Sequence, residues 1–348
     1  MSNQIDRDIA MMRRAIRLSM RGFPAPNPHV GCVIATGDTI VGEGYHHYAG
    51  APHAEVEALT AAGSNATGAT AYVTQEPCNH QGRTPPCTEA LLAAKIARVV
   101  VACLDPNPIA AGGIEKLRSA GVEVSVGLLD AEAAEANDQF LTAMRFKRPR
   151  VVLKAAMSLD GRIALPSGES KWLTSPLARK QAHRLRAECG AVLVGRRTVE
   201  ADDPSLTARI PGVVNQPIRV ILDPGAKLHG HWKVFDDSAP TIHVVNGTFG
   251  LLAGPEGFNL DELCEALFKK GVLGLMVEGG AATISRFIKA RLFDRVELFV
   301  APKLLGNGPS WVDGLGLERL ADAPELSLIS LKKLKGDVQI SLRHERGN

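Results

Sequence analysis

Three side chains that commonly bind zinc lie between residues 52 and 87, and a carboxylate accompanies them. His53, Cys78 and Cys87 supply one imidazole and two thiolates, a donor set that holds zinc in catalytic sites and leaves a fourth position for water. Glu55 follows the histidine by two residues, where a carboxylate can move protons without binding the metal. These residue types in this order predict a catalytic zinc centre with Glu55 as its general acid and base.

The order of the residues also indicates a reaction. A His-x-Glu segment followed by Pro-Cys and a second cysteine is the signature of zinc-dependent nucleobase deaminases. Zinc lowers the pKa of bound water from about 15.7 to about 7, so Glu55 would take a proton from that water and return it to the ring nitrogen and the departing ammonia. The usual spacing is Cys-x-x-Cys, whereas eight residues separate Cys78 from Cys87 here.

A structural zinc site is the alternative interpretation of the same ligands. In such a site a fourth protein side chain completes the coordination, and His80, Cys32 and Cys103 are the candidates. A binding module stabilised by zinc would need neither a proton-transferring carboxylate nor an open position. Because Glu55 is present, we favour catalysis.

The local structure must bring His53 and Glu55 to one point. Residues 53–62 read as a helix, and side chains at positions i and i+2 of a regular helix point to nearly opposite sides. The two side chains can therefore share a site only if the helix begins at the histidine. Pro52 suits such an entry.

Both cysteines are expected at the ends of elements. Residues 69–74 read as an apolar strand that leads toward Cys78, and two prolines precede Cys87 at the start of a helix over residues 88–95. A thiolate at a helix N-terminus is favoured by the exposed amides and the helix dipole. Further helices are expected at 5–16 and 113–120, and strands at 30–36, 39–45, 99–103 and 122–126. This alternation predicts a sheet covered by helices.

The segment Pro-Cys-Asn-His-Gln-Gly-Arg-Thr-Pro-Pro-Cys at residues 77–87 resembles the deaminase half of the bifunctional riboflavin-biosynthesis deaminase–reductases. Pro-Asn-Pro-His-Val-Gly at 26–31 and Leu-Asp-Pro-Asn-Pro at 104–108 add to the similarity. The long loop between the cysteines separates this family from cytidine, deoxycytidylate and tRNA-adenosine deaminases. The resemblance implies a cytidine-deaminase-like, three-layer α/β/α domain. Gln75 departs from the family pattern, which has an aliphatic residue there.

The resemblance also implies how the substrate binds. Asn27, His46 and His80 would contact the pyrimidine, and Lys154 would approach the site from the junction between the two halves of the chain. The residue types alone are equally compatible with plainer roles. Asn27 suits a turn beside prolines, His46 a solvated strand end, and His80 a loop cap.

The second half of the chain repeats the alternation of strands and helices and predicts a second, largely parallel sheet. Ser175 is the expected N-cap of a helix over residues 175–188, with Pro176 at the first position. Further helices are expected at 260–270 and 283–290, and strands at 151–156, 191–195, 218–223, 241–246, 274–277 and 295–300.

One strand-to-helix turn in this half is a candidate phosphate site. Residues 275–283 read as a strand, two glycines and a helix start, an arrangement that lets a phosphate approach backbone amides. No Gly-x-Gly-x-x-Gly segment follows a strand, and no Walker A sequence occurs. An ordinary turn is the alternative interpretation.

Four segments together resemble the reductase half of the same family, at residues 158–161, 168–172, 198–204 and 277–280. The resemblance implies a dihydrofolate-reductase-like α/β domain that uses NADPH. The residues implied for NADPH are Ala156, Trp172, Thr198, Asp202, Gly280, Ala281, Ala282 and Thr283. Those implied for the ribose phosphate substrate are Ser170, Arg186, Leu206, Arg209 and Glu278.

The residue types support some of these roles. A planar guanidinium suits phosphate recognition, which fits Arg186 and Arg209, although either is also compatible with a surface position. Trp172 is equally compatible with a core or interface aromatic. Asp202 is the favoured residue for polar activation near the ribose, although Asp-Asp-Pro at 202–204 also suits the start of a helix or turn.

The two resemblances together imply one enzyme with zinc and NADPH as cofactors. The first step would be hydrolytic deamination of 2,5-diamino-6-(5-phosphoribosylamino)pyrimidin-4-one. The second would be NADPH-dependent reduction of the ribosyl group to ribityl. The alternative is a single-function zinc deaminase of nucleosides or nucleotides with a repurposed C-terminal domain, and ammonia release from cytidine would favour it.

Length and charge are consistent with two domains and an anionic ligand. A chain of 348 residues is longer than one core usually supports, and a basic connector at 146–150 predicts domains at residues 1–147 and 148–348. The first part has 12 basic and 15 acidic residues, and the second has 28 and 22. The second domain therefore favours anions, while a net charge of +3 gives no case for nucleic-acid binding.

The sequence shows no targeting segment. The N-terminus lacks the apolar core of a signal peptide, and no stretch approaches the roughly 20 apolar residues of a membrane span. Six cysteines in so long a chain do not suggest a disulfide framework. We expect a cytoplasmic enzyme with a small-molecule substrate and no membrane partner. A homodimer is favoured because the related reductase fold commonly pairs through its sheet edges.

Overall fold

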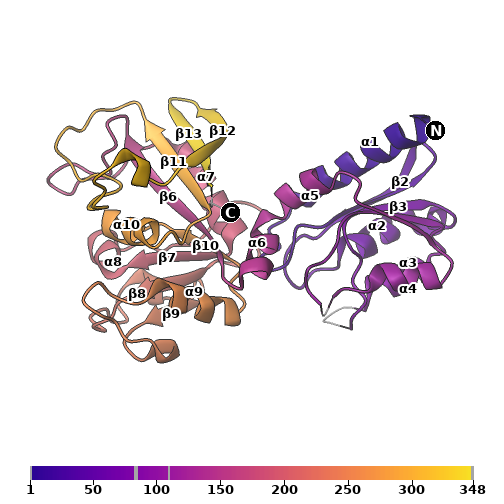
Figure 1. Ribbon diagram of the computed structural model, residues 1–348, viewed down its shortest axis with the longest axis horizontal. Helices are drawn as coiled ribbons and strands as arrows, with labels where there is room; N and C mark the ends of the chain where they lie inside the picture. Colours follow the sequence, from indigo (N-terminus) through magenta and orange to yellow (C-terminus); the bar gives the residue numbers. More distant parts are fainter. Residues whose placement is uncertain (1, 82–84, 109, 346–348) are drawn as a thin grey trace. The chain divides into compact units, whose positions relative to one another are not determined.

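The computed structural model describes residues 2–81, 85–108 and 110–345. The chain divides into two units, Met1–Phe146 and Lys147–Asn348 (Figure 1). The boundary predicted after residue 147 lies one residue from this division. Each unit has its own sheet and its own apolar core. Within the described ranges, no helix combines the length and apolarity needed to cross a membrane.

The first unit is built on a five-stranded sheet with the order β2-β1-β3-β4-β5. β1 is antiparallel to β2 and β3, while β3, β4 and β5 are parallel and connected through helices. The strands are β1 Gly31–Thr36, β2 Thr39–Tyr45, β3 Thr70–Gln75, β4 Arg98–Cys103 and β5 Glu123–Val126. The helices are α1 Ser2–Ser19, α2 Ala54–Ala62, α3 Cys87–Ala93, α4 Gly113–Ser119, α5 Asp130–Ala136 and α6 Asp138–Phe146.

Side chains of β1 alternate between two apolar cores. Cys32 and Ile34 face the core shared with α2, α3 and α4, whereas Val33 and Ala35 face the core shared with α1 and α5. Successive side chains of a strand point to opposite faces, so both faces of this sheet must be covered. The predicted three-layer α/β/α arrangement is therefore confirmed.

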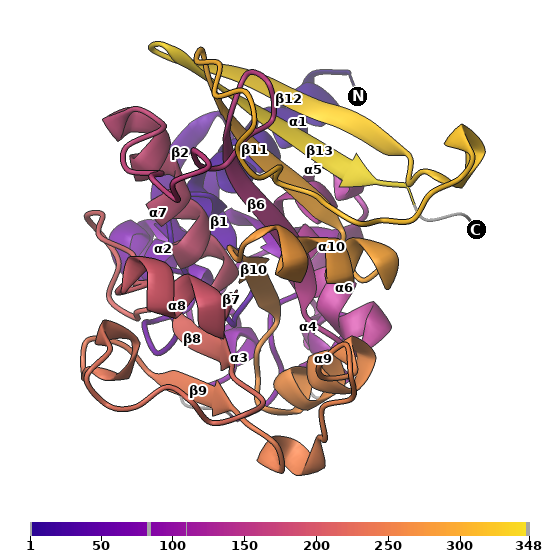
Figure 2. The same ribbon diagram turned by 90° about the vertical axis from the view of Figure 1, so that its left-hand side faces the viewer.

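The second unit contains an eight-stranded sheet with the order β12-β13-β11-β6-β10-β7-β8-β9 (Figure 2). The strands from β11 to β9 are parallel neighbours, and β13 is antiparallel to both β11 and β12. The strands are β6 Arg150–Ser158, β7 Ala191–Gly195, β8 Ile218–Leu222, β9 Thr241–Val244, β10 Gly274–Val277, β11 Arg295–Ala301, β12 Leu326–Leu334 and β13 Asp337–His344. The helices are α7 Pro176–Cys189, α8 Arg196–Asp202, α9 Leu260–Lys269 and α10 Ala281–Lys289.

The predicted start of α7 is confirmed. The Ser175 hydroxyl accepts a hydrogen bond from the backbone N–H of Ala178 at 3.3 Å, and Pro176 is the first helical residue. The start of α10 differs from its prediction. It begins at Ala281 rather than at residue 283, directly after Gly280.

The sequence patterns do not predict α5, α6, α8 or the hairpin of β12 and β13. Asn137 separates α5 from α6 and leaves the helical region (φ −106°, ψ 14°), so neither helix produces a long periodic pattern. In β12 a register shift between Leu328 and Ser330 interrupts the alternation of buried and exposed residues.

Candidate active sites

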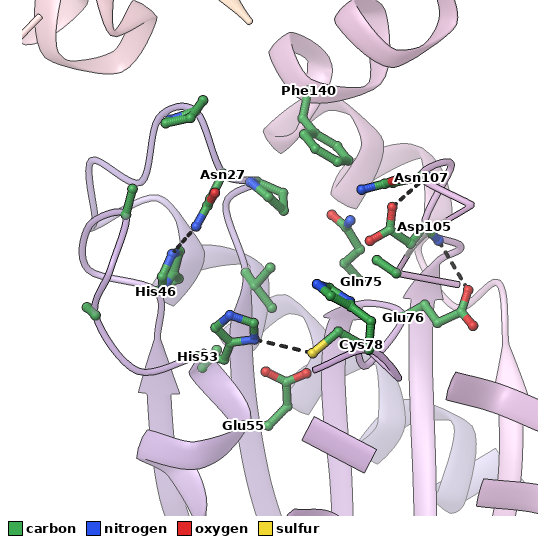
Figure 3. Close-up of a pocket in the computed structure, with 18 of the residues that line it drawn as sticks. Asn27, His46, His53, Glu55, Gln75, Glu76, Cys78, Asp105, Asn107 and Phe140 are labelled. Carbon is green, nitrogen blue, oxygen red and sulfur yellow. Dashed lines mark hydrogen bonds between the residues drawn. The ribbon is translucent and has the colours of Figure 1, made fainter. Parts of the chain in front are cut away.

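The three predicted zinc ligands converge in the first unit, and Figure 3 shows two of them, His53 and Cys78. The ligand atoms of His53, Cys78 and Cys87 all lie within 4.8 Å of one another. His53 Nδ1 is 3.1 Å from Cys87 Sγ and 3.5 Å from Cys78 Sγ. One imidazole and two thiols at these separations fit a zinc ion, because catalytic zinc sites commonly take three such protein ligands.

Each ligand stands at the end of an element. His53 precedes α2 and has an extended backbone (φ −73°, ψ 159°), Cys78 follows β3, and Cys87 is the first residue of α3. Side chains two positions apart point to nearly opposite sides only when both residues are helical. His53 lies outside the helix, so this restriction does not apply to it. Glu55 in the first turn of α2 therefore faces the same site (Figure 3).

The surroundings of the two cysteines favour a thiolate at Cys78. The Cys87 thiol donates a hydrogen bond to Cys78 Sγ and lowers the pKa of Cys78, and His53 and the backbone N–H of Cys87 act in the same direction. That hydrogen bond, together with burial and the Glu55 carboxylate, raises the pKa of Cys87. Thiolates are the form of cysteine that binds metal.

Glu55 is buried beside the ligand group. Burial raises its pKa from 4.5 to about 7, although the His53 ring acts in the opposite direction. Contact with the Cys87 side chain lowers the pKa of Glu55 by a smaller amount. A carboxyl group with a pKa near neutrality can both accept and release a proton.

The candidate fourth ligands do not join this group in the part of the chain that the structure describes. Cys103 Sγ donates to the carbonyl oxygen of Asp130 at 3.3 Å. Cys32 is fully buried in the apolar core, and burial raises its pKa. His80 lies in the wall of the adjoining cavity. This arrangement favours an open, catalytic site over a closed, structural one.

A cavity of about 460 Å³ adjoins the ligand group, and Asn27, His46 and His80 line it. His46 Nδ1 lies 3.0 Å from the carbonyl oxygen of Pro52, so it donates and carries the proton. His46 Nε2 then accepts a hydrogen bond from the Asn27 amide at 3.0 Å, which leaves the Asn27 oxygen as an acceptor. Burial lowers the pKa of His46 and so favours the neutral ring.

The cavity also has lining residues that the sequence analysis does not identify as site residues, namely Gln75, Glu76, Asp105, Asn107 and Phe140. Glu76 shows how the walls are held. Its Oε1 accepts hydrogen bonds from the backbone N–H groups of residues 112–114 at 3.0, 2.9 and 3.4 Å, and its Oε2 accepts one from Asp105 N at 3.3 Å. The sequence signal that could have identified Glu76 is an acidic residue two positions before a cysteine ligand.

A second polar cluster lies in the second unit. Lys154, which the resemblance implied would approach the deaminase site, lies on β6 of this unit, and its Nζ is 2.8 Å from one oxygen of Glu278. Arg186 approaches the other oxygen at 2.8 Å. Burial opposes ionisation of Glu278, but the two cations outweigh burial and lower its pKa. Burial and the neighbouring charge of Arg186 lower the pKa of Arg209. Three cations around one carboxylate leave an excess of positive charge, which suits an anion.

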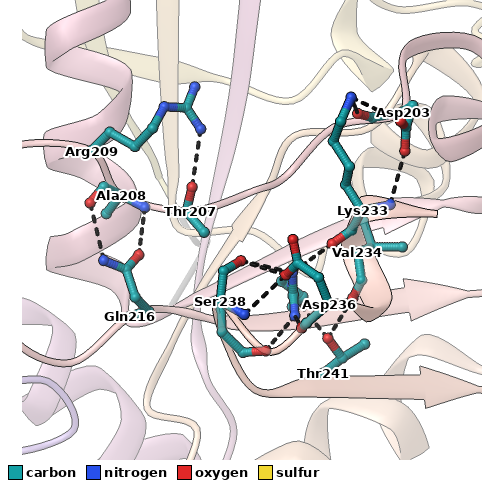
Figure 4. Close-up of polar contacts among 12 residues, drawn as sticks. Asp203, Thr207, Ala208, Arg209, Gln216, Lys233, Val234, Asp236, Ser238 and Thr241 are labelled. Carbon is teal, nitrogen blue, oxygen red and sulfur yellow. Dashed lines mark hydrogen bonds and ion pairs between the residues drawn. The ribbon is translucent and has the colours of Figure 1, made fainter. Parts of the chain in front are cut away.

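The loop that carries Arg209 is held by side chains (Figure 4). The Arg209 guanidinium donates to Thr207 Oγ1 at 3.0 Å, and Arg186 donates to the Thr207 carbonyl oxygen at 3.0 Å. Gln216 pairs with both backbone groups of Ala208. Leu206 is buried with φ at +53°. These contacts bring Arg186, Leu206 and Arg209 close together.

Two strand-to-helix turns meet at the carboxyl ends of β7 and β10, which are parallel neighbours. Gly280 N donates to Thr198 Oγ1 at 3.3 Å. A Cβ at Gly279 would lie 2.8 Å from Cβ of Thr283, so only glycine permits this approach. In the described structure no side chain caps α10, whose first residues are Ala281 and Ala282. Backbone amides left uncapped at a helix start are of the kind that binds a phosphate group.

The other residues implied for the reductase site are spread over neighbouring segments. Ala156 lies on β6 two positions after Lys154 and therefore points to the same face. Trp172 is 66% exposed, which excludes a core role, and the Arg179 guanidinium stacks 4.4 Å from its ring centre. Lys171 Nζ lies 3.6 Å from the Asp202 carboxylate, and Ser170 is the preceding residue.

Comparisons with known proteins cover both units. The cytidine and deoxycytidylate deaminase zinc-binding region matches residues 5–103, and the RibD C-terminal domain matches residues 149–340. The riboflavin biosynthesis protein RibD of Aquifex aeolicus is 44% identical over 98% of this chain and 99% of its own. Its counterpart from Escherichia coli is 42% identical over 95% of this chain and 98% of its own.

Solved structures are similar over the same extent. Acinetobacter baumannii RibD (form 1) is 39% identical, with 98% of this chain and 100% of that chain covered and a TM-score of 0.87. A diaminohydroxyphosphoribosylaminopyrimidine deaminase/5-amino-6-(5-phosphoribosylamino)uracil reductase from Thermotoga maritima is 34% identical, with 98% and 99% covered and a TM-score of 0.86. The cytidine-deaminase-like and dihydrofolate-reductase-like domains implied by the sequence are confirmed. This chain therefore belongs to the RibD family of riboflavin biosynthesis proteins.

Proposed function

We propose that this chain is a bifunctional enzyme of riboflavin biosynthesis. Its first unit deaminates 2,5-diamino-6-(5-phosphoribosylamino)pyrimidin-4-one with zinc, and its second unit reduces the ribosyl group to ribityl with NADPH. The observation that carries the proposal is the convergence of His53, Cys78 and Cys87 beside a buried Glu55. A single-function deaminase is not favoured, because the second half matches the RibD C-terminal domain.

In the deaminase unit, Glu55 moves the protons. His53, Cys78 and Cys87 would hold the zinc ion, which when bound would make a water acidic enough to lose a proton at neutral pH. A Glu55 carboxylate oxygen takes one proton from the attacking water and gives it to the ring nitrogen, and it then moves the proton of the added hydroxyl to the departing amino group. One water is consumed and one ammonia leaves. The pKa of Glu55, about 7, supports transfer in both directions.

Polar groups of the cavity would orient the pyrimidine. The Asn27 oxygen is an acceptor for a ring amino group, because the Asn27 amide nitrogen is already committed to His46. His80 Nδ1 is buried and receives no hydrogen bond from any described residue. A buried polar atom normally has a partner, so a polar atom of the substrate would supply it.

In the reductase unit, the cation cluster would bind the substrate phosphate. Arg186 and Arg209 offer guanidinium groups that match phosphate oxygens, Lys154 adds a third cation, and Glu278 holds two of the three cations in place. NADPH supplies a hydride to ribose C1′ when bound. The further substrate contacts that we propose are Ser170 and Leu206. The cofactor contacts that we propose are Ala156, Trp172, Thr198, Asp202, Gly280, Ala281, Ala282 and Thr283.

A two-stage assay tests this function. The purified zinc-loaded protein is incubated with the phosphoribosylaminopyrimidine, first without and then with NADPH. We expect ammonia without NADPH, and NADPH oxidation only after ammonia has formed. Ammonia without later NADPH oxidation, or ammonia from cytidine in place of this substrate, would support the single-function alternative.

We further propose a cytoplasmic location and a homodimer. All six cysteines are free and buried, which is consistent with a reducing compartment. The edge strand β12 exposes Leu328 and Leu331, and exposed apolar edge strands tend to pair. The substrate is a small molecule, and neither proposal requires a nucleic acid or a membrane.

A further inference from the structure

One wall of the deaminase cavity comes from a segment outside the zinc-binding region that other deaminases share. The match to that region ends at residue 103, whereas Phe140 of α6 is buried and lines the cavity. Figure 3 shows its ring across the cavity from His53, Glu55 and Cys78. This aromatic wall therefore lies outside the part of the chain that matches the shared zinc-binding region.

Asn137 connects this wall to the sheet. Its Oδ1 accepts from His29 N at 2.7 Å, and its Nδ2 donates to the His29 carbonyl oxygen at 2.9 Å and to Gln75 Oε1 at 3.3 Å. Gln75 in turn donates a hydrogen bond to the Asp105 carboxylate. Asn137 and Gln75 are both buried. An aliphatic residue at position 75 would make neither bond.

The geometry of the substrate indicates what this wall meets. In a pyrimidine, position 5 lies across the ring from position 2. When the 2-amino group faces Glu55, as the proposed deamination requires, the 5-amino and 6-ribosylamino groups point toward the opposite wall. We propose that α6 completes the deaminase pocket. Phe140 is a specificity-determining residue that packs against the ribosylamino arm, and Asn137 is a positioning residue that acts through Gln75.

The test compares two substrates that share a ring. One is the phosphoribosylaminopyrimidine, and the other is 2,5,6-triaminopyrimidin-4-one, which lacks the arm. For Phe140→Ala we expect the KM for the first to rise about ten-fold with little change in kcat, as an aromatic contact is lost. The KM for the armless compound and the zinc content should remain unchanged. Phe146→Ala is the matched control, because Phe146 is on the same helix, is 43% exposed and is not among the cavity-lining residues.

Equal losses for both compounds, or no loss for either, would overturn the role of Phe140. If Phe140→Ala does not fold, Phe140→Leu keeps most of the apolar volume and should still raise the KM for the phosphoribosylated compound alone. A wild-type enzyme that releases ammonia from neither compound would instead contradict the proposed function.

The role of Asn137 is tested by a double-mutant cycle. Asn137→Ala and Gln75→Leu should each raise the KM for the phosphoribosylated substrate, and the double variant should be no worse than the poorer single variant. A merely structural role for Asn137 predicts additive losses that fall on kcat and stability instead. Additive losses would therefore overturn this part of the proposal.

Discussion

Glu55 is buried away from water, and this burial sets the pKa of its carboxyl group and therefore the chemistry it can perform. Burial raises its pKa to about 7, and the nearby His53 ring only partly opposes this. An exposed glutamate, with a pKa of about 4.3, would hold few protons to return at neutral pH. The backbone contributes as well, because the extended conformation of His53 lets both side chains face one site.

We expect Glu55→Gln to lower the rate of ammonia release about 10²- to 10⁴-fold, because an amide has a similar shape but cannot transfer the proton. Zinc content, measured by elemental analysis, should stay the same. Glu57→Gln is the control on the same helix, since Glu57 pairs with His47 at 2.9 Å, and it should keep its activity. Loss of zinc from Glu55→Gln, or undiminished turnover, would contradict the assigned role.

Glu278 makes a contribution to stability that depends on pH. Lys154 and Arg186 overcome the effect of burial and hold its pKa below the ordinary value of 4.5. A carboxyl with a lowered folded-state pKa stabilises the protein above its unfolded-state pKa, and this contribution is lost as the pH falls toward the folded-state value.

Glu278→Gln should therefore reduce the free energy of unfolding at neutral pH by about 1–3 kcal/mol, because two cations lose their partner. The difference from wild type should begin to shrink below about pH 4.5. Urea unfolding of both proteins at neutral pH and in steps down to about pH 3 measures this difference in the free energy of unfolding. A difference that stays constant over this range would show that Glu278 acts through packing rather than through its charge.

At the scale of elements, the deaminase site is held by the ends of helices and strands. Glu76 follows β3 directly and binds the N–H groups at the start of α4, so one carboxylate joins two elements. Gly113 makes this approach possible, because a Cβ there would lie 1.9 Å from the carbonyl oxygen of Pro77. Pro77 precedes Cys78, so this packing reaches a zinc ligand.

Gly113→Ala should displace the segment that carries Cys78. We expect a loss of about 1–3 kcal/mol in the free energy of unfolding from overpacking, together with faster loss of zinc to a chelator. Gly230→Ala is the comparison, since a Cβ there would meet nothing within 4 Å, and it should change stability by no more than about 0.5 kcal/mol. Similar behaviour of the two variants would contradict the close-approach argument.

Elements with local signals could be predicted from the sequence. The helix expected at residues 53–62 is α2, Ala54–Ala62, and the strand expected at 69–74 is β3, Thr70–Gln75. The zinc ligands could be predicted for a similar reason, because a histidine and two cysteines in this order are typical of a zinc site. The resemblance to a family was needed for the reductase cluster, since Lys154 and Glu278 meet across 124 positions.

Features that depend on distant contacts could not be predicted. The break between α5 and α6 is set by Asn137, whose side chain bonds to His29 across 108 positions. Phe140 follows that break by three residues and lines the cavity, and no local pattern indicates it. In β12 the interrupted alternation and the exposed leucines conceal a strand whose pairing with β13 becomes evident only in the folded sheet.

At the scale of the whole molecule, the edge of the second sheet leads to a prediction about assembly. Leu328 is 57% exposed and Leu331 is 60% exposed on the edge strand β12. Light scattering coupled to size-exclusion chromatography should give twice the chain mass of 37.1 kDa. Leu328→Lys combined with Leu331→Lys should give monomers, because charged edge strands resist pairing.

Leu320→Lys serves as the control for that experiment. Leu320 is 92% exposed but lies outside β12, so the dimer should persist. A monomeric wild-type protein, or a dimer unaffected by the charges on β12, would contradict pairing along this strand.

Each sulfur ligand stands at the end of its own element, Cys78 after β3 and Cys87 as the first residue of α3, and the two segments bond directly, with Cys87 N donating to Cys78 Sγ at 3.5 Å. The distance between the sulfurs therefore does not depend on how many residues connect them. Insertions and deletions in that connection can accumulate during evolution without displacing the metal. Divergence in substrate preference among related deaminases can thus proceed by changes in loop length while the hydrolytic chemistry is inherited intact.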